Sequence, residues 1–115
     1  MTELEFKEAI EMLRSKDSMT FEDGFHWLIG HADEYLEQLA SLIQNEPIPD
    51  LRGKLIEVLG HCSNEKAISI LAAELSNEDR DIRFWAHSQL EYFDNPKAEE
   101  IANKYKIENP NEDWY

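Results

Sequence analysis

The residues of this chain with the most obvious chemical potential are its four histidines and its single cysteine. The histidines are His26, His31, His61 and His87, and their spacings match no familiar metal-ligand pattern. Cys62 falls on the apolar side of an expected helix, away from the positive charge that would activate a thiol. The sequence also lacks a glycine-rich phosphate loop and a nucleophile elbow. It therefore predicts no metal site, no cofactor and no enzymatic activity.

Carboxylates dominate the charged groups of the chain. There are 25 Asp and Glu residues against 11 Lys and Arg residues, which gives a formal net charge of -14. Such a chain repels nucleic acid and anionic membranes and attracts basic proteins. The N-terminal residues do not resemble a signal peptide, and no apolar stretch approaches the ~20 residues of a membrane span. We expect a cytoplasmic protein with a basic protein partner.

The acidic residues are unevenly distributed along the sequence. From Asp17 to Leu51 there is no Lys or Arg, whereas beyond Leu51 acids are interspersed with bases in the usual solubilising mixture. Like charges gathered in one segment repel one another, which suggests that they serve an outside partner. The alternative is an ordinary solvated acidic surface. The candidate partner-binding acids are Asp17, Glu22, Asp23, Asp33, Glu34 and Glu37.

The elements that must position these acids are helices that recur along the chain. Residues 50–76 have the pattern of two short helices, and the pattern begins again after a shift of 31 positions. A fixed period of this length is typical of a helical solenoid. The residues Asp50, Arg52, Leu59, Asn64, Lys66, Ala67 and Ile70 recur as Asp81, Arg83, Leu90, Asn95, Lys97, Ala98 and Ile101.

The repeat resembles the short HEAT-like repeats of bacteria. The resemblance lies in the Asp-apolar-Arg opening at Asp50, the Leu-Gly pair that starts at Leu59, and the Ala-rich second helix. It implies an all-α fold, a short right-handed α-α superhelix of about three helical hairpins with an N-terminal capping helix. It also implies that Arg52 and Arg83 form a ladder of salt bridges and cap bonds between neighbouring repeats. HEAT-fold di-iron hydroxylases carry repeated His-Glu pairs, and HEAT-like DNA glycosylases have a basic groove; this sequence has neither feature.

We expect a single domain, because 115 residues can bury one continuous core. The first helix is expected to be a cap, since the end of a solenoid otherwise exposes its stacking face. The expected divisions are a capping helix over residues 1–16, hairpins over 20–45, 50–76 and 79–106, and an acidic tail over 107–115 that is loosely held or laid over the last helix.

Local signals predict where the helices begin. Thr2, followed by an acid three residues later, is typical of a capping box. Thr20 with Asp23 is expected to cap the next helix, and Asp50 to cap the helix after the two neighbouring prolines. The helices of the first hairpin are expected over residues 21–29 and 32–44.

Phe84 and Trp85 depart from the repeat pattern. By the 31-position shift they correspond to Gly53 and its neighbour, which we expect to face water. Burying either aromatic against a partner is worth ~2 kcal/mol or more, so both are candidate partner-binding residues. Alternatively, they are covered by Trp114 and Tyr115 of the tail or by a second copy of the chain.

Together these features predict a small acidic protein-binding solenoid. Small acidic HEAT-like proteins resemble immunity proteins of bacterial toxin systems, in which an acidic surface blocks the basic site of a nuclease toxin. The alternative is a HEAT-like scaffold or adaptor for a cellular partner, either a monomer or a weak homodimer through Phe84 and Trp85. A chromophore-lyase function, associated with longer HEAT-like proteins, is a third option.

Overall fold

The computed structural model describes residues 1–114, which form seven α-helices and no strand. The all-α prediction is therefore confirmed. No helix in this range is both long and apolar enough to cross a bilayer. The helices are α1 (Glu3–Leu13), α2 (Ser18–Ile29), α3 (Leu36–Asn45), α4 (Pro49–Leu59), α5 (Lys66–Glu74), α6 (Arg80–Tyr92) and α7 (Pro96–Glu108).

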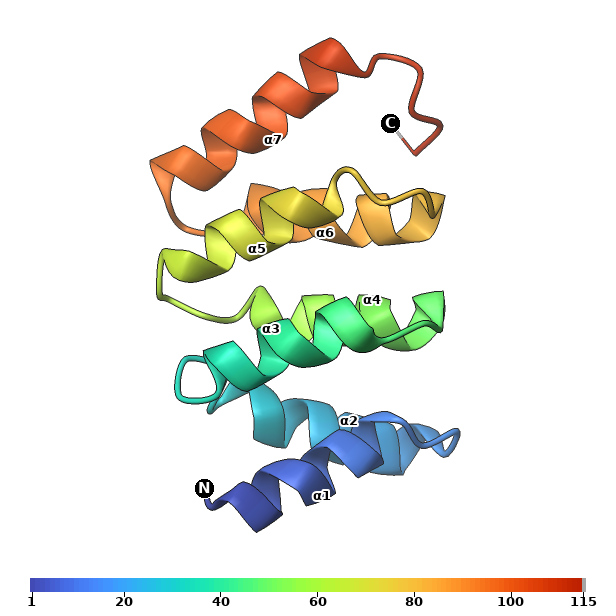
Figure 1. The fold of residues 1–115 in the computed structure, drawn as a ribbon, viewed down its shortest axis with the longest axis vertical. Coiled ribbons are helices and arrows are strands. Elements are labelled where there is room, and N and C mark those ends of the chain that lie inside the picture. Colours follow the sequence, from blue (N-terminus) through green and yellow to red (C-terminus); the bar gives the residue numbers. More distant parts are fainter. Residues whose placement is uncertain (115) are drawn as a thin grey trace.

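The helices lie in successive layers along the longest axis of the molecule (Figure 1). The first layer pairs α1 with α2, the second α3 with α4, and the third α5 with α6. Helix α7 packs on α6 and lies at the opposite end of the molecule from α1 (Figure 1). Within each layer a short connection joins the two helices, and these connections follow α1, α3 and α5. The expected hairpin 20–45 contains α2 and α3, and the expected hairpin 50–76 contains α4 and α5, so each extends over two layers.

Residues 31 positions apart occupy similar places in the core. Leu28, Leu59 and Leu90 are all buried, on α2, α4 and α6. Leu36, Ala67 and Ala98 are also buried, each near the start of α3, α5 or α7. The periodic apolar pattern of the sequence thus corresponds to one continuous core through the layers.

The first two helices begin at side-chain caps. Thr2 forms the expected capping box with Glu5, with donor–acceptor distances of 2.9 and 3.1 Å. The expectation for α2 was wrong, because the helix begins at Ser18 and its cap is Asp17. The Asp17 carboxylate accepts hydrogen bonds from the amide of Thr20 at 3.0 Å and from its hydroxyl at 2.7 Å. These bonds start the helix three residues earlier than predicted.

Helix α3 is shorter than the sequence pattern predicts. It begins at Leu36, and residues 31–35 form turns instead of the expected first helical turns. The reason is tertiary: the Tyr35 ring stacks on Phe6 with centroids 4.4 Å apart, and its hydroxyl donates to the Met1 carbonyl at 2.8 Å. Contacts to α1 therefore outweigh the local helical preference of this segment.

Helices α4, α6 and α7 begin as follows. Asp50 was wrongly expected to cap α4; the helix starts at Pro49, and Asp50 lies exposed within its first turn. Helix α6 starts after Asp79, whose carboxylate accepts from two backbone amides of the first turn. Helix α7 has Asn95 as its cap and Pro96 in its first turn, and it ends at Glu108, two residues beyond the expected hairpin.

Arginine–glutamate pairs connect the layers along one edge of the stack. Arg14 at the end of α1 binds Glu46 at the end of α3 at 2.5 Å. Arg52 on α4 donates two hydrogen bonds, of 3.0 and 2.6 Å, to Glu74 at the end of α5. Glu46 and Glu74 are buried, so each is neutralised by the arginine of the preceding layer. Arg52 makes a structural ion pair, but it does so within the expected hairpin 50–76 and not between neighbouring repeats as predicted. The Arg14 pair was not anticipated.

The loops at the opposite edge are joined by hydrogen bonds at the same period. Asp33 accepts from the amides of Ser63 and Asn64 at 2.9 to 3.0 Å. One layer further, Glu65 accepts from the Asn95 side chain at 3.0 Å. Asn64 and Asn95 each accept from the amide two residues ahead, at 2.9 and 2.8 Å. Both edges of the stack therefore hold neighbouring layers in register.

We predict that Glu74→Ala lowers the free energy of unfolding by about 3 kcal/mol, because it leaves the largely buried Arg52 without its carboxylate. The control Asp50→Ala removes an exposed carboxylate 3.6 Å from Lys54 and should cost less than ~1 kcal/mol. Urea denaturation of both variants tests the difference. Equal losses would show that the Arg52–Glu74 pair contributes no more than a surface pair.

The contact between α4 and α6 depends on a glycine. A methyl group at Gly53 would overlap the Trp85 indole, whereas one at Gly60 would meet only the flexible end of Gln89. We predict that Gly53→Ala destabilises the protein by about 1–3 kcal/mol, despite the better helix propensity of alanine. Gly60→Ala, in the same helix region, should be neutral or mildly stabilising. Adding Trp85→Leu should remove most of the Gly53→Ala penalty in a double-mutant cycle followed by thermal unfolding.

Candidate functional site

Two of the predicted partner-binding acids, Asp17 and Asp33, make hydrogen bonds within the protein. Asp17 caps α2, and its pKa is lowered by the hydroxyl and then the amide of Thr20. Asp33 holds the loop of the next layer. Partial burial raises the pKa of Asp33, but the hydrogen bonds from Ser63 and Asn64 outweigh it and lower the pKa overall. Both carboxylates therefore have structural roles that account for their presence.

Glu34 and Glu37 have partners on the protein surface. Glu34 lies in the 31–35 turns, not on the helix where it was expected, and pairs with His31 at 3.0 Å. Glu37 lies on α3, and its carboxylate is 4.0 Å from the amine of Lys66. Both pairs are exposed, and such pairs contribute little to stability. These two acids remain accessible to a partner.

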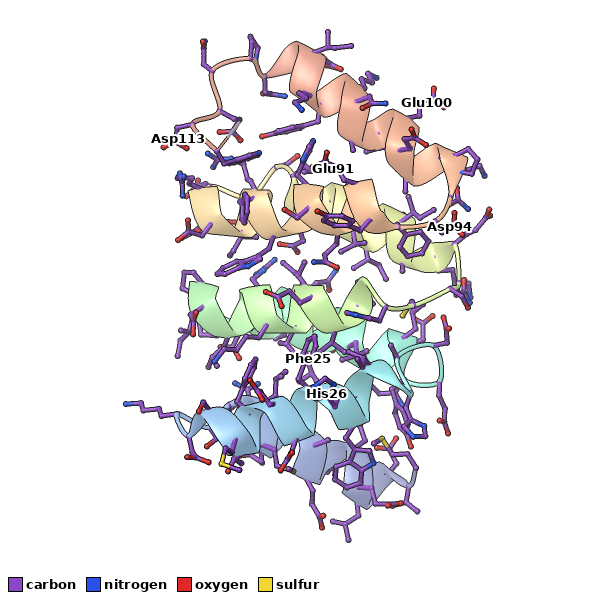
Figure 2. The ribbon with its side chains drawn as sticks, turned by 180° about the vertical axis from the view of Figure 1, so that it is seen from behind. Phe25, His26, Glu91, Asp94, Glu100 and Asp113 are labelled. Atoms are coloured by element: carbon purple, nitrogen blue, oxygen red, sulfur yellow. The ribbon has the colours of Figure 1, made fainter. Side chains whose placement is uncertain are left out.

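Glu22 and Asp23 on α2 are the predicted acids with no internal partner. Both are exposed, and within residues 1–114 neither side chain makes a hydrogen bond or an ion pair. The same helix carries Phe25 and His26, which lie on the side of the molecule seen in Figure 2. Phe25 packs edge-on against the ring of His61, which follows the end of α4, with centroids 5.7 Å apart. The exposed side of α2 thus combines free carboxylates with aromatic side chains, a combination that the sequence analysis missed.

The two predicted aromatics are largely used inside the molecule. Trp85 is only partly exposed and packs against the backbone of Gly53, so the expectation that position 53 faces water was wrong. Phe84 is 38% exposed, and its ring meets the edge of Trp114 with centroids 6.0 Å apart. Trp114 therefore covers part of Phe84, as the alternative proposed; Tyr115 lies outside the described residues.

Charge pairing leaves a surplus of free carboxylates. Across residues 1–114 every arginine takes part in an ion pair, and among the lysines only Lys7 and Lys16 have no partner. The basic groups are thus mostly neutralised, whereas many acids are not. The side-chain carboxylates without an internal hydrogen bond or ion pair are those of Glu8, Glu11, Glu22, Asp23, Glu57, Glu78, Asp94, Glu99 and Glu100.

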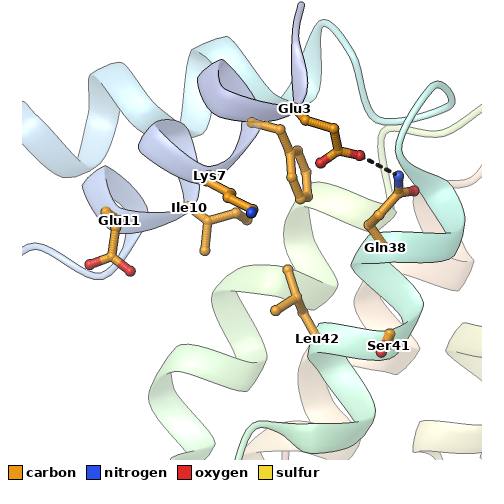
Figure 3. Close-up of a pocket in the computed structure, with 8 residues that line it drawn as sticks. Glu3, Lys7, Ile10, Glu11, Gln38, Ser41 and Leu42 are labelled. Carbon is orange, nitrogen blue, oxygen red and sulfur yellow. Dashed lines mark hydrogen bonds between the residues drawn. The ribbon is translucent and has the colours of Figure 1, made fainter.

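A groove between α1 and α3 is a second candidate binding surface. It has a volume of about 440 Å³, and its apolar lining comes from Phe6, Ile10 and Leu42 (Figure 3). Polar groups surround this lining, among them Glu3, which accepts a 3.2 Å hydrogen bond from Gln38 (Figure 3). An apolar surface with a polar rim can hold a side chain or a short segment of a partner. The residues of this groove were not predicted as a site.

The geometry offers little for catalysis or metal binding. Within residues 1–114 no group of three or more His, Cys, Asp and Glu side chains could hold a metal ion. Burial raises the pKa of Cys62 to about 12, with the nearby Asp33 adding to the effect, so the thiol stays protonated near neutral pH. Half-burial also raises the pKa of Glu57.

The segment 109–114, which we call the tail, lies against α6 and α7 (Figure 1). Arg83 donates to both oxygens of Glu112 at 2.9 and 3.0 Å, and Tyr105 donates to the same carboxylate at 2.5 Å. Arg80 pairs with Asp113 at 2.5 Å. Residues 109–114 are therefore held against α6 and α7, whereas Ile107 and Glu108, which were expected in the tail, belong to α7.

We predict a pH-dependent release of the tail through Glu112. Its pKa lies below the ordinary value of 4.5, chiefly because Arg83 donates hydrogen bonds to the ionised form. A lowered pKa in the folded state means that the stabilisation is complete above pH 4.5 and is lost as the pH falls through the lowered value. Nuclear magnetic resonance of the Arg83 Nε–H group should follow this loss.

Glu112→Gln should abolish that pH step and weaken the tail contact at neutral pH. The control Glu108→Gln alters an exposed carboxylate 3.8 Å from Lys104 and should leave the step in place. A step that persists in the Glu112→Gln variant would mean that another carboxylate controls the tail.

Comparisons with known proteins give no family assignment. A scan against models of protein families, a search of curated proteins and a search of solved structures find no match to this chain. The function must therefore be inferred from the chain's own geometry, in which free carboxylates, the exposed side of α2 and the α1–α3 groove are the accessible features.

Proposed function

We propose that this protein is a non-enzymatic binding protein, a short HEAT-like solenoid that inhibits a basic protein. In its most specific form it is an immunity protein whose acidic face blocks the basic substrate site of a nuclease-type toxin. The observation that carries the proposal is the unequal use of charge, since the arginines are paired internally while many carboxylates are not. Free carboxylates attract a cationic partner and speed its association.

The exposed side of α2 is the contact surface that we propose for this partner. Glu22 supplies free charge there beside the partly exposed rings of Phe21 and Phe25. Asp23, two residues from either ring, supplies free charge on another part of the exposed helix surface. Interface residues that dominate binding are often aromatic and surrounded by polar groups. The Lys54 Nζ atom lies 4.4 Å from the centroid of the Phe21 ring, so one positive charge lies over this surface. Glu34 and Glu37 can add weaker electrostatic attraction from the neighbouring α3 region.

An adaptor function is the alternative, and the α1–α3 groove favours it. Phe6 and Ile10 are almost fully buried at the base of the groove, while Leu42 is partly exposed. A partner segment could therefore pack against Leu42 while α1 and α3 stay folded. The self-associating version has less support, because Trp85 packs on Gly53 and Phe84 is partly covered by Trp114. An adaptor of this kind would depend on Leu42 more than on the acids of α2.

We predict that the double variant Glu22→Lys and Asp23→Lys slows association with the partner by at least ~10-fold at low salt, because steering by these charges is lost. The partner would first be captured from the source cells by the natural protein and identified by mass spectrometry. Interferometry at two salt concentrations would then measure its association rate, and a nuclease assay would measure inhibition at equal molar amounts.

Glu99→Lys with Glu100→Lys is the matched control. These two adjacent acids on α7 are also exposed and unpaired, so the change in net charge is identical. The control should keep most of the association rate. An acidic captured partner, or equal effects of the two double variants, would contradict the proposed surface, and loss of binding only in Leu42→Asp would favour the adaptor.

A further inference from the structure

The tail lies on a surface that differs in charge from the rest of the molecule. This surface, the tail groove, is formed by Arg80, Arg83 and Phe84 of α6 and by Tyr105 of α7. Two arginines lie within one helical turn of each other, in a chain that is otherwise strongly acidic. Figure 2 shows Asp113 at this end of the molecule, beside α6. The groove is thus suited to an acidic segment.

The contacts of the tail define what the groove recognises. Glu112 is held by a two-point interaction with Arg83, and its side chain is only 13% exposed. Two parallel bonds from one guanidinium give both strength and orientation. Asp113 is more exposed and pairs with Arg80, so it adds charge at the rim. Two arginines therefore bind two consecutive carboxylates.

An aromatic ring follows the two acids. The Trp114 ring stacks on Tyr105 with centroids 6.2 Å apart and planes 5° from parallel. It meets Phe84 edge-on at 6.0 Å, and the guanidinium carbon of Arg83 lies 5.8 Å from its centre. Stacking and cation–π contacts of this kind favour an aromatic residue at the third position.

The repeat explains why the groove needs an added carboxylate. Arg83 corresponds to Arg52 by the 31-position shift, and Tyr105 corresponds to Glu74. Arg52 binds Glu74 of the next helix, but Tyr105 has no carboxylate to offer Arg83, so the tail supplies one through Glu112. In the other layers the glutamate is built into a helix end. Here it comes from a segment outside any helix, and a segment of another protein could replace it.

We propose that the tail groove is a peptide-binding site occupied by the protein's own tail, and that an acidic–aromatic segment of a partner protein binds it by displacing the tail. The segment would carry two consecutive carboxylates followed by an aromatic residue. This site is separate from the proposed surface on α2, which attracts basic groups, and it lies at the other end of the stack (Figure 1). Its failure or success is therefore independent of the proposed function.

The attached tail sets how strongly an outside segment must compete. A short connection from α7 keeps the tail at an effective concentration on the order of millimolar near the groove. An added peptide therefore binds the natural protein weakly, and binds well once the tail contacts are removed. The general negative charge of the protein opposes the approach of an acidic peptide, so binding should be measured at moderate salt.

The test uses the full chain with Glu112→Gln, Asp113→Asn and Trp114→Ala, and a fluorescently labelled peptide with the sequence of residues 109–114. Fluorescence anisotropy should show saturable binding to this triple variant, at least ~10-fold tighter than to the natural protein. Circular dichroism checks that the variant keeps its helices. A folded triple variant that fails to bind the peptide would overturn the proposal.

Two controls distinguish specific recognition of the peptide from nonspecific binding. Adding Arg83→Met to the triple variant should reduce peptide affinity at least ~10-fold, because the two-point contact is lost. A peptide with lysine in place of both acids should not bind the triple variant. Equal binding of the two peptides, or an unchanged affinity after Arg83→Met in a folded protein, would show that the groove does not read carboxylates.

Discussion

Arginine–glutamate pairs between layers are the interaction on which the rest of this structure depends. Arg14 with Glu46, Arg52 with Glu74, and Arg83 with Glu112 each connect one layer to the element that follows it. Burying a carboxylate is acceptable only when a well-placed cation and further hydrogen bonds satisfy it. The pairs therefore fix how the layers stack. They also neutralise the positive charges of the arginines that form them. A surface poor in free positive charge follows directly from how the fold is held together.

The helices and the core could be predicted because they depend on local patterns. The burial of Leu28, Leu59 and Leu90 follows from apolar residues at helical spacing repeated at a fixed period. The partner of each charge could not be predicted in this way. Asp33 bonds to amides about 30 residues ahead, and nothing near Asp33 in sequence distinguishes it from the free Asp23. Counting acidic residues along the sequence located the acidic region. It did not show which of those residues have no internal hydrogen bond or ion pair.

The aromatic residues show a second limit of sequence reasoning. Trp85 became a candidate contact residue because the residues at its equivalent position and beside it are small or charged and were expected to face water. The structure uses the small residue differently, since Gly53 leaves space for the indole of the next layer. Complementary pairing of a glycine with a large ring joins two repeats and is invisible within either one. Conversely, Glu22 and Phe25 of α2 are three residues apart in one helix, and helical spacing alone could have placed them side by side.

The tail connects stability with the charge that the protein presents to a partner. Arg80 and Arg83 are neutralised by Asp113 and Glu112, so with the tail in place this end of the molecule carries little free positive charge. Moving the tail away would leave the Arg83 charge without a carboxylate and expose an aromatic surface at one end, with Arg80 still paired to Asp81, while Glu22 and Asp23 of α2 stay unchanged. A basic partner bound at α2 would then meet a molecule with opposite charges at its two ends. Because the exchange of one acidic–aromatic segment for another keeps the arginines paired, it is the change at this end of the stack that least disturbs the proposed acidic surface.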